Sequence, residues 1–473
     1  MEKYLIVGAG RSGICSANML EALGKKYAIY DANVNLDKEM LIDRLDNKNP
    51  ELILGEVTDS TLEGIDICVT SPGVPLETPI LTAVQNKGIP LWSEIELAYL
   101  YDKGQVIALT GTNGKTTTTS LTYEIVKSFN EKTLLVGNIE IPYTGLALSS
   151  EEGGATVAEI SSFQLETMLT FKPKVSAILN ITPDHLDRHK TMENYENVKK
   201  SIAKNQDEND FCVLNFEDSV LREFGKDLKC NALFFSSLHE LNDGLYYKDG
   251  VIYLAEGGES TPYIRTDETN LVGLHNFENI MAAVAMTRAF GVPDEIIKQA
   301  VREFVAVEHR IEFVAEIGGV KYYNDSKGTN TDAAIKAIDA MPSKTVLIAG
   351  GYDKKSEYDE WVSRFPEKVR RLVLIGQTRE NIAAFHKAGI EVNCWTCDTK
   401  EEAEKLIDEG IITGGMIPKV RNCFRSIEGG VNRVHILNGS IPHCLLLEIF
   451  TDRGVGTVIM KDGVKYYNRE RSS

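Results

Sequence analysis

Short apolar runs recur along the chain, and each is followed by a glycine or polar turn and then by a stretch with helical periodicity. The runs are too short for helices and are bounded by turn residues, so they are predicted to be buried strands: residues 4–7, 27–30, 106–109, 133–136, 156–160 and 175–180. Buried strands that alternate with helices predict an α/β fold built on parallel sheets.

The clearest turn follows the apolar run at residues 106–109. It reads Gly111-Thr112-Asn113-Gly114, and Lys115, Thr116 and Thr117 open the next helix. A strand, a glycine turn and a helix start together form a phosphate cradle, in which Lys115 supplies charge and Thr116 can bind Mg²⁺. The spacing is two residues shorter than in the common P-loop. The alternative to a phosphate cradle is an ordinary glycine-rich turn with an exposed lysine.

A second glycine pattern, Gly8-x-Gly10-x-x-Gly13, follows the first strand, and Asp31 ends the next one. An acidic residue there is placed for a ribose hydroxyl. The pattern suits NAD, FAD or another nucleotide diphosphate, and it also occurs in a plain βα turn.

Polar clusters follow two central strands. Glu159, Ser161 and Gln164 follow one strand, and residues 182–189, including His185, follow another. Carboxyl ends of strands in open α/β sheets are where ligands gather, so one site with Mg²⁺ is expected there. Asn276 precedes an alanine-rich helix and so lies at or near its N-cap. The simple explanation for this residue is that it caps the helix.

Composition narrows the choice of partner. The 473 residues are 43% hydrophobic and carry a net charge of −18, which argues against nucleic acid and anionic membranes. No apolar run approaches the roughly 20 residues that span a membrane, and no signal peptide is recognised. Eight scattered cysteines, including the C-x-x-C at Cys394 and Cys397, suit a reducing cytoplasm.

These motifs resemble the Mur ligase family. The resemblance covers about residues 1–400 and rests on GTNGKTTT, GNI-x-IP, EISSFQLE, NITPDHLDRH, GLHNFEN, EHRIEFV, NDSKGTN and GGYDK, in that order. It implies three α/β domains: a Rossmann-like domain at 1–98 for the UDP end of the substrate, a P-loop-type ATPase domain at 99–304, and a Rossmann-like C-terminal domain at 305–402. It also implies a monomer that uses ATP and Mg²⁺ to add D-glutamate to UDP-N-acetylmuramoyl-L-alanine in peptidoglycan synthesis.

The resemblance assigns roles by motif. The implied catalytic residues are Lys115, Glu159, His185 and Lys199. The implied ATP contacts are Gly111, Thr112, Asn113, Gly114, Lys115, Thr116, Thr117, Asn276, Arg310 and Asp325. The implied metal ligands are Thr116 and Glu159 for one Mg²⁺, His185 for a second, and a carbamylated Lys199, with Lys200 as the adjacent alternative. The implied substrate contacts are Arg11, Ser12, Asp31, Ser71, Gly73, Asn138, Ser161 and Gln164, with Lys327, Thr329 and Lys354 for D-glutamate.

Two features depart from the family pattern. The family motif GNIGIP reads GNIEIP here, so that Glu140 stands where the family usually has glycine. The Ser-Pro-Ala-rich loop that the family pattern predicts after about residue 400 is absent. Residues 403–473 instead resemble the end of acetylglutamate kinase, and Lys419 matches that family's ATP-site lysine. The rest of the kinase is missing, so no kinase activity is expected. In the tail, helices are predicted at 419–427 and 443–450 and strands at 434–437 and 456–460.

Three functions follow from these observations. The first is the D-glutamate-adding ligase. The second is another amino-acid-adding member of the superfamily; EISSFQLE and the absence of a D-N-P-R loop argue against the member that adds diaminopimelate or lysine. The third is a fusion that binds ATP and UDP-sugar but is impaired in ligation.

Overall fold

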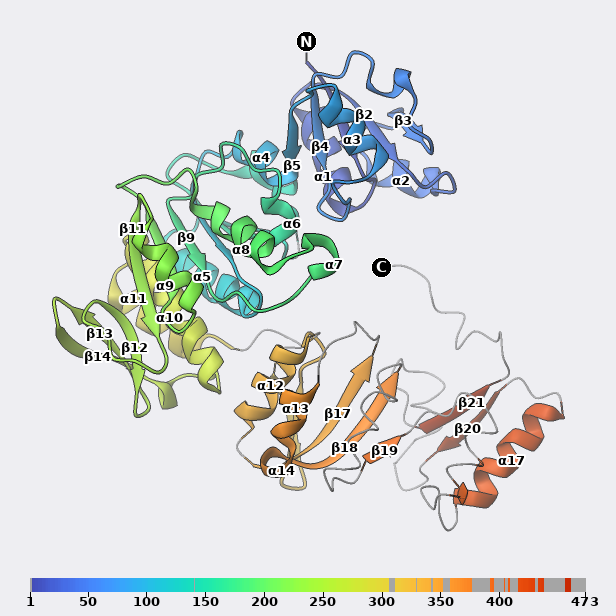
Figure 1. Ribbon diagram of the computed structural model, residues 1–473, viewed down its shortest axis with the longest axis vertical. Coiled ribbons are helices and arrows are strands. Elements are labelled where there is room, and N and C mark those ends of the chain that lie inside the picture. The colour runs from blue at the N-terminus through green and yellow to red at the C-terminus, as the bar shows by residue number, and fades with distance from the viewer. Residues whose placement is uncertain are drawn as a thin grey trace. The chain divides into compact units, whose positions relative to one another are not determined.

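The computed structural model describes residues 2–139, 141–305, 311–328, 330–341, 343–351, 358–376, 392–394, 404, 407–408, 416–429, 433–437 and 456–460. Figure 1 labels the helices and strands along the chain. The chain divides into two compact units, residues 1–342 and residues 343–473. Each unit is described by itself.

The first unit opens with a five-stranded parallel sheet in the order β3-β2-β1-β4-β5. Its strands are β1 (Lys3–Val7), β2 (Lys26–Asp31), β3 (Glu51–Leu54), β4 (Ile67–Thr70) and β5 (Leu91–Ser93). Its helices are α1 (Arg11–Ala22), α2 (Lys38–Arg44), α3 (Pro79–Asn86) and α4 (Glu94–Tyr99), with a 3-10 turn η1 (Asp59–Leu62). A side chain at Gly13 would collide with the Gly8 carbonyl, so the first turn needs glycine there. The strand order reverses between β1 and β4, where such sheets bind ligands.

A nine-stranded sheet follows, in the order β14-β13-β12-β11-β10-β9-β6-β8-β7. Its strands are β6 (Gln105–Thr110), β7 (Thr133–Gly137), β8 (Ala155–Glu159), β9 (Val175–Ile178), β10 (Phe211–Asn215), β11 (Asn231–Ser236), β12 (Gly244–Lys248), β13 (Val251–Glu256) and β14 (Glu259–Arg265). The run from β7 to β12 is parallel, and β13 and β14 add an antiparallel edge.

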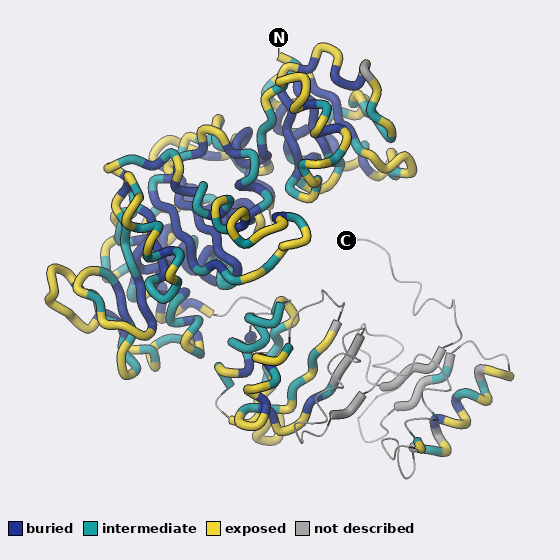
Figure 2. Tube along the Cα trace, viewed as in Figure 1, coloured by how far each residue is buried: buried dark blue, intermediate teal, exposed yellow. Residues whose placement is uncertain are grey.

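Helices pack around this sheet. They are α5 (Lys115–Phe129), α6 (Ser162–Leu165), α7 (Leu186–His189), α8 (Met192–Lys200), α9 (Ser219–Lys226), α10 (Leu274–Phe290) and α11 (Asp294–Glu303), with 3-10 turns η2 (Tyr143–Gly145), η3 (Ala147–Ser149), η4 (Ser201–Ala203) and η5 (Thr266–Glu268). Apolar side chains of β6, β8, β9, α5 and α10 share one buried cluster. Figure 2 shows these strands as continuous buried segments. The rigid core therefore holds the turns that leave β6, β8 and β9.

The first unit ends with the antiparallel pair β15 (Glu312–Ile317) and β16 (Val320–Asn324), followed by α12 (Thr331–Ala340). The second unit contains the parallel strands β17 (Thr345–Gly351), β18 (Val369–Gly376) and β19 (Val392–Cys394), with α13 (Asp359–Ser363) and α14 (Phe365–Lys368).

The tail contains α17 (Met416–Glu428) and the antiparallel pair β20 (Arg433–Leu437) and β21 (Gly456–Met460). These elements agree with the helix predicted at 419–427 and the strands predicted at 434–437 and 456–460. The helix predicted at 443–450 lies outside the described residues. Within the described part of the second unit, β20 and β21 form a sheet of their own and do not extend the sheet of β17 to β19.

Candidate functional site

The glycine turn connects β6 to α5 as expected. Gly114 is the residue before the helix and has φ +83°, a conformation that L side chains rarely adopt. The Lys115 ammonium donates to the carbonyl oxygens of Gly111 at 2.8 Å and of Thr112 at 2.9 Å. The lysine is thus folded onto its own loop, with its charge at the start of α5 beside Thr116. Backbone amides and a cation at a helix N-terminus suit phosphate oxygens.

Glu159 ends β8 and is 2% exposed. Its Oε1 atom accepts from Asn138 Nδ2 at 2.8 Å. Its Oε2 atom is buried, with no hydrogen-bond partner among the described residues. A buried carboxylate oxygen without a partner is costly, so this atom suits a hard cation such as Mg²⁺.

Lys199 lies on α8 and is 1% exposed. Its Nζ atom donates to the Gly111 carbonyl at 2.8 Å. Burial, followed by the charge of Lys115, lowers its pKa well below the usual value. Lys200 instead faces Glu196 at 3.4 Å and is partly exposed. Of the two adjacent lysines, Lys199 is the one that enters the glycine loop.

His185 is the residue before α7 and has φ +53°. Its ring packs edge-on against Phe163 at 4.9 Å between centroids, and Asp184 lies 3.7 Å from its Nε2 atom. Within the described residues, His, Cys, Asp and Glu side chains form no group of three that could hold a metal. The expected ligand set differs from such a group because it includes Thr116 and Lys199.

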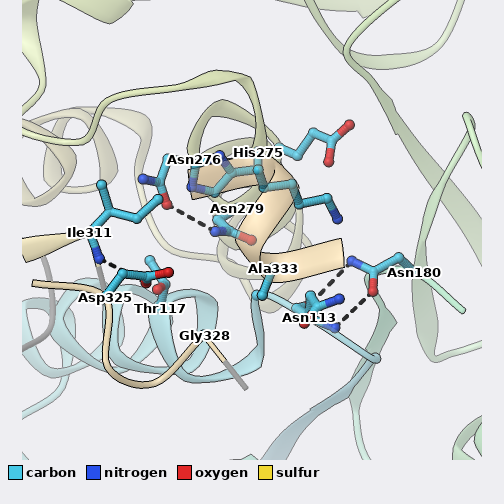
Figure 3. Close-up of a pocket in the computed structure, with 13 residues that line it drawn as sticks. Asn113, Thr117, Asn180, His275, Asn276, Asn279, Ile311, Asp325, Gly328 and Ala333 are labelled. Atoms are coloured by element: carbon cyan, nitrogen blue, oxygen red, sulfur yellow. Dashed lines mark hydrogen bonds between the residues drawn. The ribbon is translucent and has the colours of Figure 1, made fainter. Parts of the chain in front are cut away.

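A pocket lies beside the glycine loop (Figure 3). It is lined by Asn113, Gly114, Thr117, Asn180, His275, Asn276, Glu278, Asn279, Ile311, Asp325, Gly328, Ala333 and Lys336. Five of the residues expected to contact ATP line this pocket: Asn113, Gly114, Thr117, Asn276 and Asp325. The pocket also includes Asn180, His275, Glu278, Asn279 and Lys336, which were not among the candidates.

Hydrogen bonds order the walls of this pocket. The Asn330 side-chain amide donates to Asn113 Oδ1 at 3.2 Å, and Asn113 in turn donates to Asp332. The Ile311 backbone amide donates to Asp325 Oδ1 at 3.1 Å. The glycine loop is therefore tied to the start of α12, which lies more than 200 residues further along the chain.

Asn276 is not the N-cap of α10, although capping was the alternative to a nucleotide contact. Helix α10 begins at Leu274 after Gly273, so Asn276 lies inside the first turn. Its Nδ2 atom donates to the Val272 carbonyl at 2.8 Å, and its Oδ1 atom accepts from Asn279 at 3.1 Å. Asn279 is the next polar residue on the same helix face, and the three-residue spacing was the signal that could have identified it.

The expected substrate residues of the first sheet lie at its carboxyl edge. Asp31 accepts from the backbone amides of Ala9 and Asn33, both at 2.9 Å, so its carboxylate helps to hold the glycine turn. Ser71 donates to the Gly8 carbonyl at 3.3 Å. Arg11 and Ser12 open α1, and Gly73 is exposed in the turn after β4.

Asn138, Ser161 and Gln164 lie near Glu159, but each also has a structural partner. Ser161 caps α6 and donates to Gln164 Oε1 at 2.9 Å. Gln164 donates to the buried Glu94 at 2.9 Å. Lys327 is exposed in the turn after β16. Glu140, His309, Arg310, Thr329, Lys354 and Cys397 lie outside the described residues, and the side-chain environment of Lys419 is not described.

Among the described residues, no helix is long and apolar enough to cross a membrane.

Comparison with known proteins identifies related sequences along most of the chain. Residues 2–93 match the Mur ligase MurD-like N-terminal domain, residues 109–287 the Mur ligase middle domain, and residues 309–413 the Mur ligase glutamate ligase domain. A UDP-N-acetylmuramoylalanine–D-glutamate ligase of Lachnospira eligens is 49% identical over 414 residues, which cover 87% of this chain and 92% of the relative. The ligase of that name from Thermoanaerobacter pseudethanolicus is 46% identical over 430 residues, 91% of each chain.

Solved structures share the fold at low identity. The UDP-N-acetylmuramate–alanine ligase of Thermotoga maritima has a TM-score of 0.54 at 16% identity and covers 91% of this chain and all of its own. A ligase of Acinetobacter baumannii, MurF, has a TM-score of 0.54 at 18% identity, with 86% and 87% covered. The expected three-domain α/β fold is thereby confirmed.

Proposed function

Because this chain belongs to the Mur ligase family, a family of ATP-dependent ligases that form amide bonds, we propose that it adds D-glutamate to UDP-N-acetylmuramoyl-L-alanine in peptidoglycan precursor synthesis. Relatives at 46–49% identity carry the name of that activity. The observation that carries the proposal is the pocket that joins the glycine loop, α10 and the start of α12, because it offers a nucleotide site with a phosphate cradle at one wall.

ATP would bind with its phosphates at Gly111, Thr112, Gly114 and Lys115, and with its nucleoside end toward Asn276 and Asp325. The positions of Asn113, Gly114, Thr117, Asn276 and Asp325 on one pocket support this assignment. Arg310 is assigned to the same nucleotide by its motif alone.

The proposed chemistry has two steps. A carboxylate oxygen of the UDP substrate attacks the γ-phosphorus of ATP, the bond to ADP breaks, and an acyl phosphate forms. The amine of D-glutamate then attacks the acyl carbon, phosphate leaves with the acyl oxygen, and the nitrogen loses a proton. Lys115 lies where it can balance the charge that develops on the transferred phosphoryl group.

Thr116 and Glu159 would hold one Mg²⁺ and His185 a second, with Lys199 as a carbamate completing the set of metal ligands. Bound Mg²⁺ supplies charge neutralisation at the phosphate oxygens. The buried Glu159 oxygen without a partner supports this set. So does the lowered pKa of Lys199, because the neutral amine is the form that can take up CO₂. The carbamate gives this position a negative charge, which suits a cation as a bare ammonium does not.

The UDP substrate would contact Arg11, Ser12, Asp31, Ser71 and Gly73 in the first sheet, and Asn138, Ser161 and Gln164 near Glu159. D-Glutamate would contact Lys327, Thr329 and Lys354. We also propose that the domains span residues 1–98, 99–304, 305–402 and 403–473. The protein is proposed to be a monomer and to act in the cytoplasm. The five free cysteines described fit a reducing compartment.

A second candidate is a fusion that binds ATP and UDP-sugar but ligates poorly. It is favoured by the tail: the glutamate ligase domain match ends at residue 413, and the sheet of β20 and β21 is separate from that of β17 to β19. We propose that residues 403–473 derive from an acetylglutamate kinase end and lack kinase activity.

Phosphate release from the full chain with ATP, Mg²⁺ and UDP-N-acetylmuramoyl-L-alanine distinguishes the two candidates. Strong stimulation by D-glutamate supports the ligase. Nucleotide binding with slow release that ignores D-glutamate contradicts the ligase and supports the impaired fusion.

A further inference from the structure

Arg188, on α7, reaches the turn that follows β4 in the first sheet. Its Nη1 atom donates to the Pro72 carbonyl at 2.7 Å, and its Nη2 atom donates to the Val74 carbonyl at 3.1 Å. The turn is closed by the Val74 amide, which donates to the Ser71 carbonyl at 3.0 Å. One guanidinium therefore binds two carbonyls of a turn that is more than 100 residues away in sequence.

The guanidinium is itself fixed from the other side. Its Nε and Nη2 atoms donate to the two oxygens of Glu166 at 3.2 and 2.5 Å. Its Cζ atom lies 4.2 Å from the centre of the Phe163 ring. The side chains of Arg188 and Glu166 are only 11% and 9% exposed. A planar donor group with a paired carboxylate and a stacked ring has little freedom to move.

The two segments that Arg188 joins are both parts of the proposed site. Ser71 and Gly73 lie in the turn and are assigned to the UDP substrate, whereas His185 lies at the start of α7 and is assigned to the metal. The backbone amides of Arg188 and His189 donate to the His185 carbonyl at 3.1 and 3.0 Å. Arg188 therefore belongs to the same hydrogen-bonded turn as His185.

We propose that Arg188 is a positioning residue that sets the turn at 71–74, and with it the nucleotide end of the UDP substrate, against the His185 turn. This inference rests on the proposed function. It goes beyond that function because Arg188 touches neither reacting group. Lysine cannot replace it, since one ammonium lacks the planar fork that binds two carbonyls and a carboxylate together.

The test compares Arg188→Lys with Arg222→Lys. Arg222 is a matched control: it donates to the Phe216 carbonyl at 2.6 Å and lies 5.1 Å over the Phe216 ring, but it is on α9, outside the site. In Arg188→Lys the KM for UDP-N-acetylmuramoyl-L-alanine should rise about tenfold or more, as expected for lost hydrogen bonds to a charged group. The KM for ATP should stay within about twofold, because the nucleotide pocket is untouched.

Calorimetric binding of UDP-N-acetylmuramoyl-L-alanine separates this inference from the proposed function. If the wild type binds the UDP substrate but does not turn it over, the function fails, and the Kd of Arg188→Lys still tests the positioning role. A KM and Kd in Arg188→Lys equal to those in Arg222→Lys would overturn the proposal, as would a loss of kcat alone.

A second variant guards against misfolding, because a buried Glu166 charge that lysine pairs less completely than arginine would be destabilising. Arg188→Gln combined with Glu166→Gln removes both charges and should show the same rise in KM with a near-normal melting temperature. An unchanged KM in this folded double variant would also overturn the proposal.

Discussion

Lys199 donates a hydrogen bond to the Gly111 carbonyl over 2.8 Å, so a buried lysine lies against the loop expected to hold the ATP phosphates. Burial and the charge of Lys115 lower the pKa of its amine. Lys200 points instead to Glu196 and is partly exposed. The geometry therefore favours Lys199 over its neighbour as the carbamylated residue.

Incubation with ¹³C-labelled bicarbonate should give a carbamate NMR signal in the wild type and in Lys200→Arg but not in Lys199→Arg. Turnover of Lys199→Arg should fall by about a hundredfold or more, since a cation would replace an anion beside the phosphates. A persistent carbamate signal in Lys199→Arg would assign the modification elsewhere.

Glu159→Gln should raise the Mg²⁺ concentration for half-maximal turnover by about tenfold or more, on the scale seen for altered metal sites. Glutamine keeps the contact with Asn138 but removes the charge at the buried oxygen. The control is Glu151→Gln, whose carboxylate is exposed and pairs with Lys132 at 2.6 Å. Equal Mg²⁺ dependence in the two variants would exclude Glu159 as a ligand.

Gly114→Ala should abolish measurable ATP binding. The residue has φ +83°, and an added Cβ would collide with the Asn279 side chain. Gly24 provides a control with φ +63° and open space around it. Gly24→Ala should cost about 1 kcal/mol of stability from backbone strain and leave the Kd for ATP unchanged. Normal ATP binding by Gly114→Ala would argue against the glycine loop as the phosphate site.

Acid should weaken the fold near His189. Burial, then the charge of Arg188, lowers the pKa of this histidine from about 6.5 to about 4, and its Nε2 atom lies 2.9 Å from Ser162 Oγ. Between pH 4 and 6.5 the unfolded chain binds more protons at this residue than the folded chain does. Stability is therefore lost as pH falls through that window.

His189→Gln should flatten this dependence, measured as the urea midpoint between pH 4 and 7. His239→Gln is the control, because His239 is exposed beside Glu217. Parallel pH profiles for the wild type and His189→Gln would contradict this account of His189.

Local patterns predicted the parts of the site that depend on local structure. The glycine loop and the polar ends of β8 and β9 follow from short-range rules, and the structure has them where expected. Asn180 follows β9 in the same way and could have been included. Lys336 could not be predicted from local sequence, because it reaches the pocket only through the placement of α12, more than 200 residues from the glycine loop.

One alternative offered by the local sequence is wrong, and one local expectation stays a prediction. A cap role for Asn276 is wrong, because Gly273, with φ +91°, ends the preceding loop one turn earlier and places Asn276 inside α10. Asp31 was expected to face a ribose, and its two oxygens accept from the Ala9 and Asn33 amides. A carboxylate has further acceptor capacity, so the ribose contact stays a prediction.

Mass analysis of the product tests the central claim most directly. The full chain would be incubated with ATP, Mg²⁺, UDP-N-acetylmuramoyl-L-alanine and an equimolar mixture of D-glutamate, L-alanine, lysine and diaminopimelate. The account predicts one new product whose mass equals the UDP substrate plus D-glutamate minus water, formed with one ADP per molecule. A product that carries another amino acid, or ATP binding without any product, would contradict it.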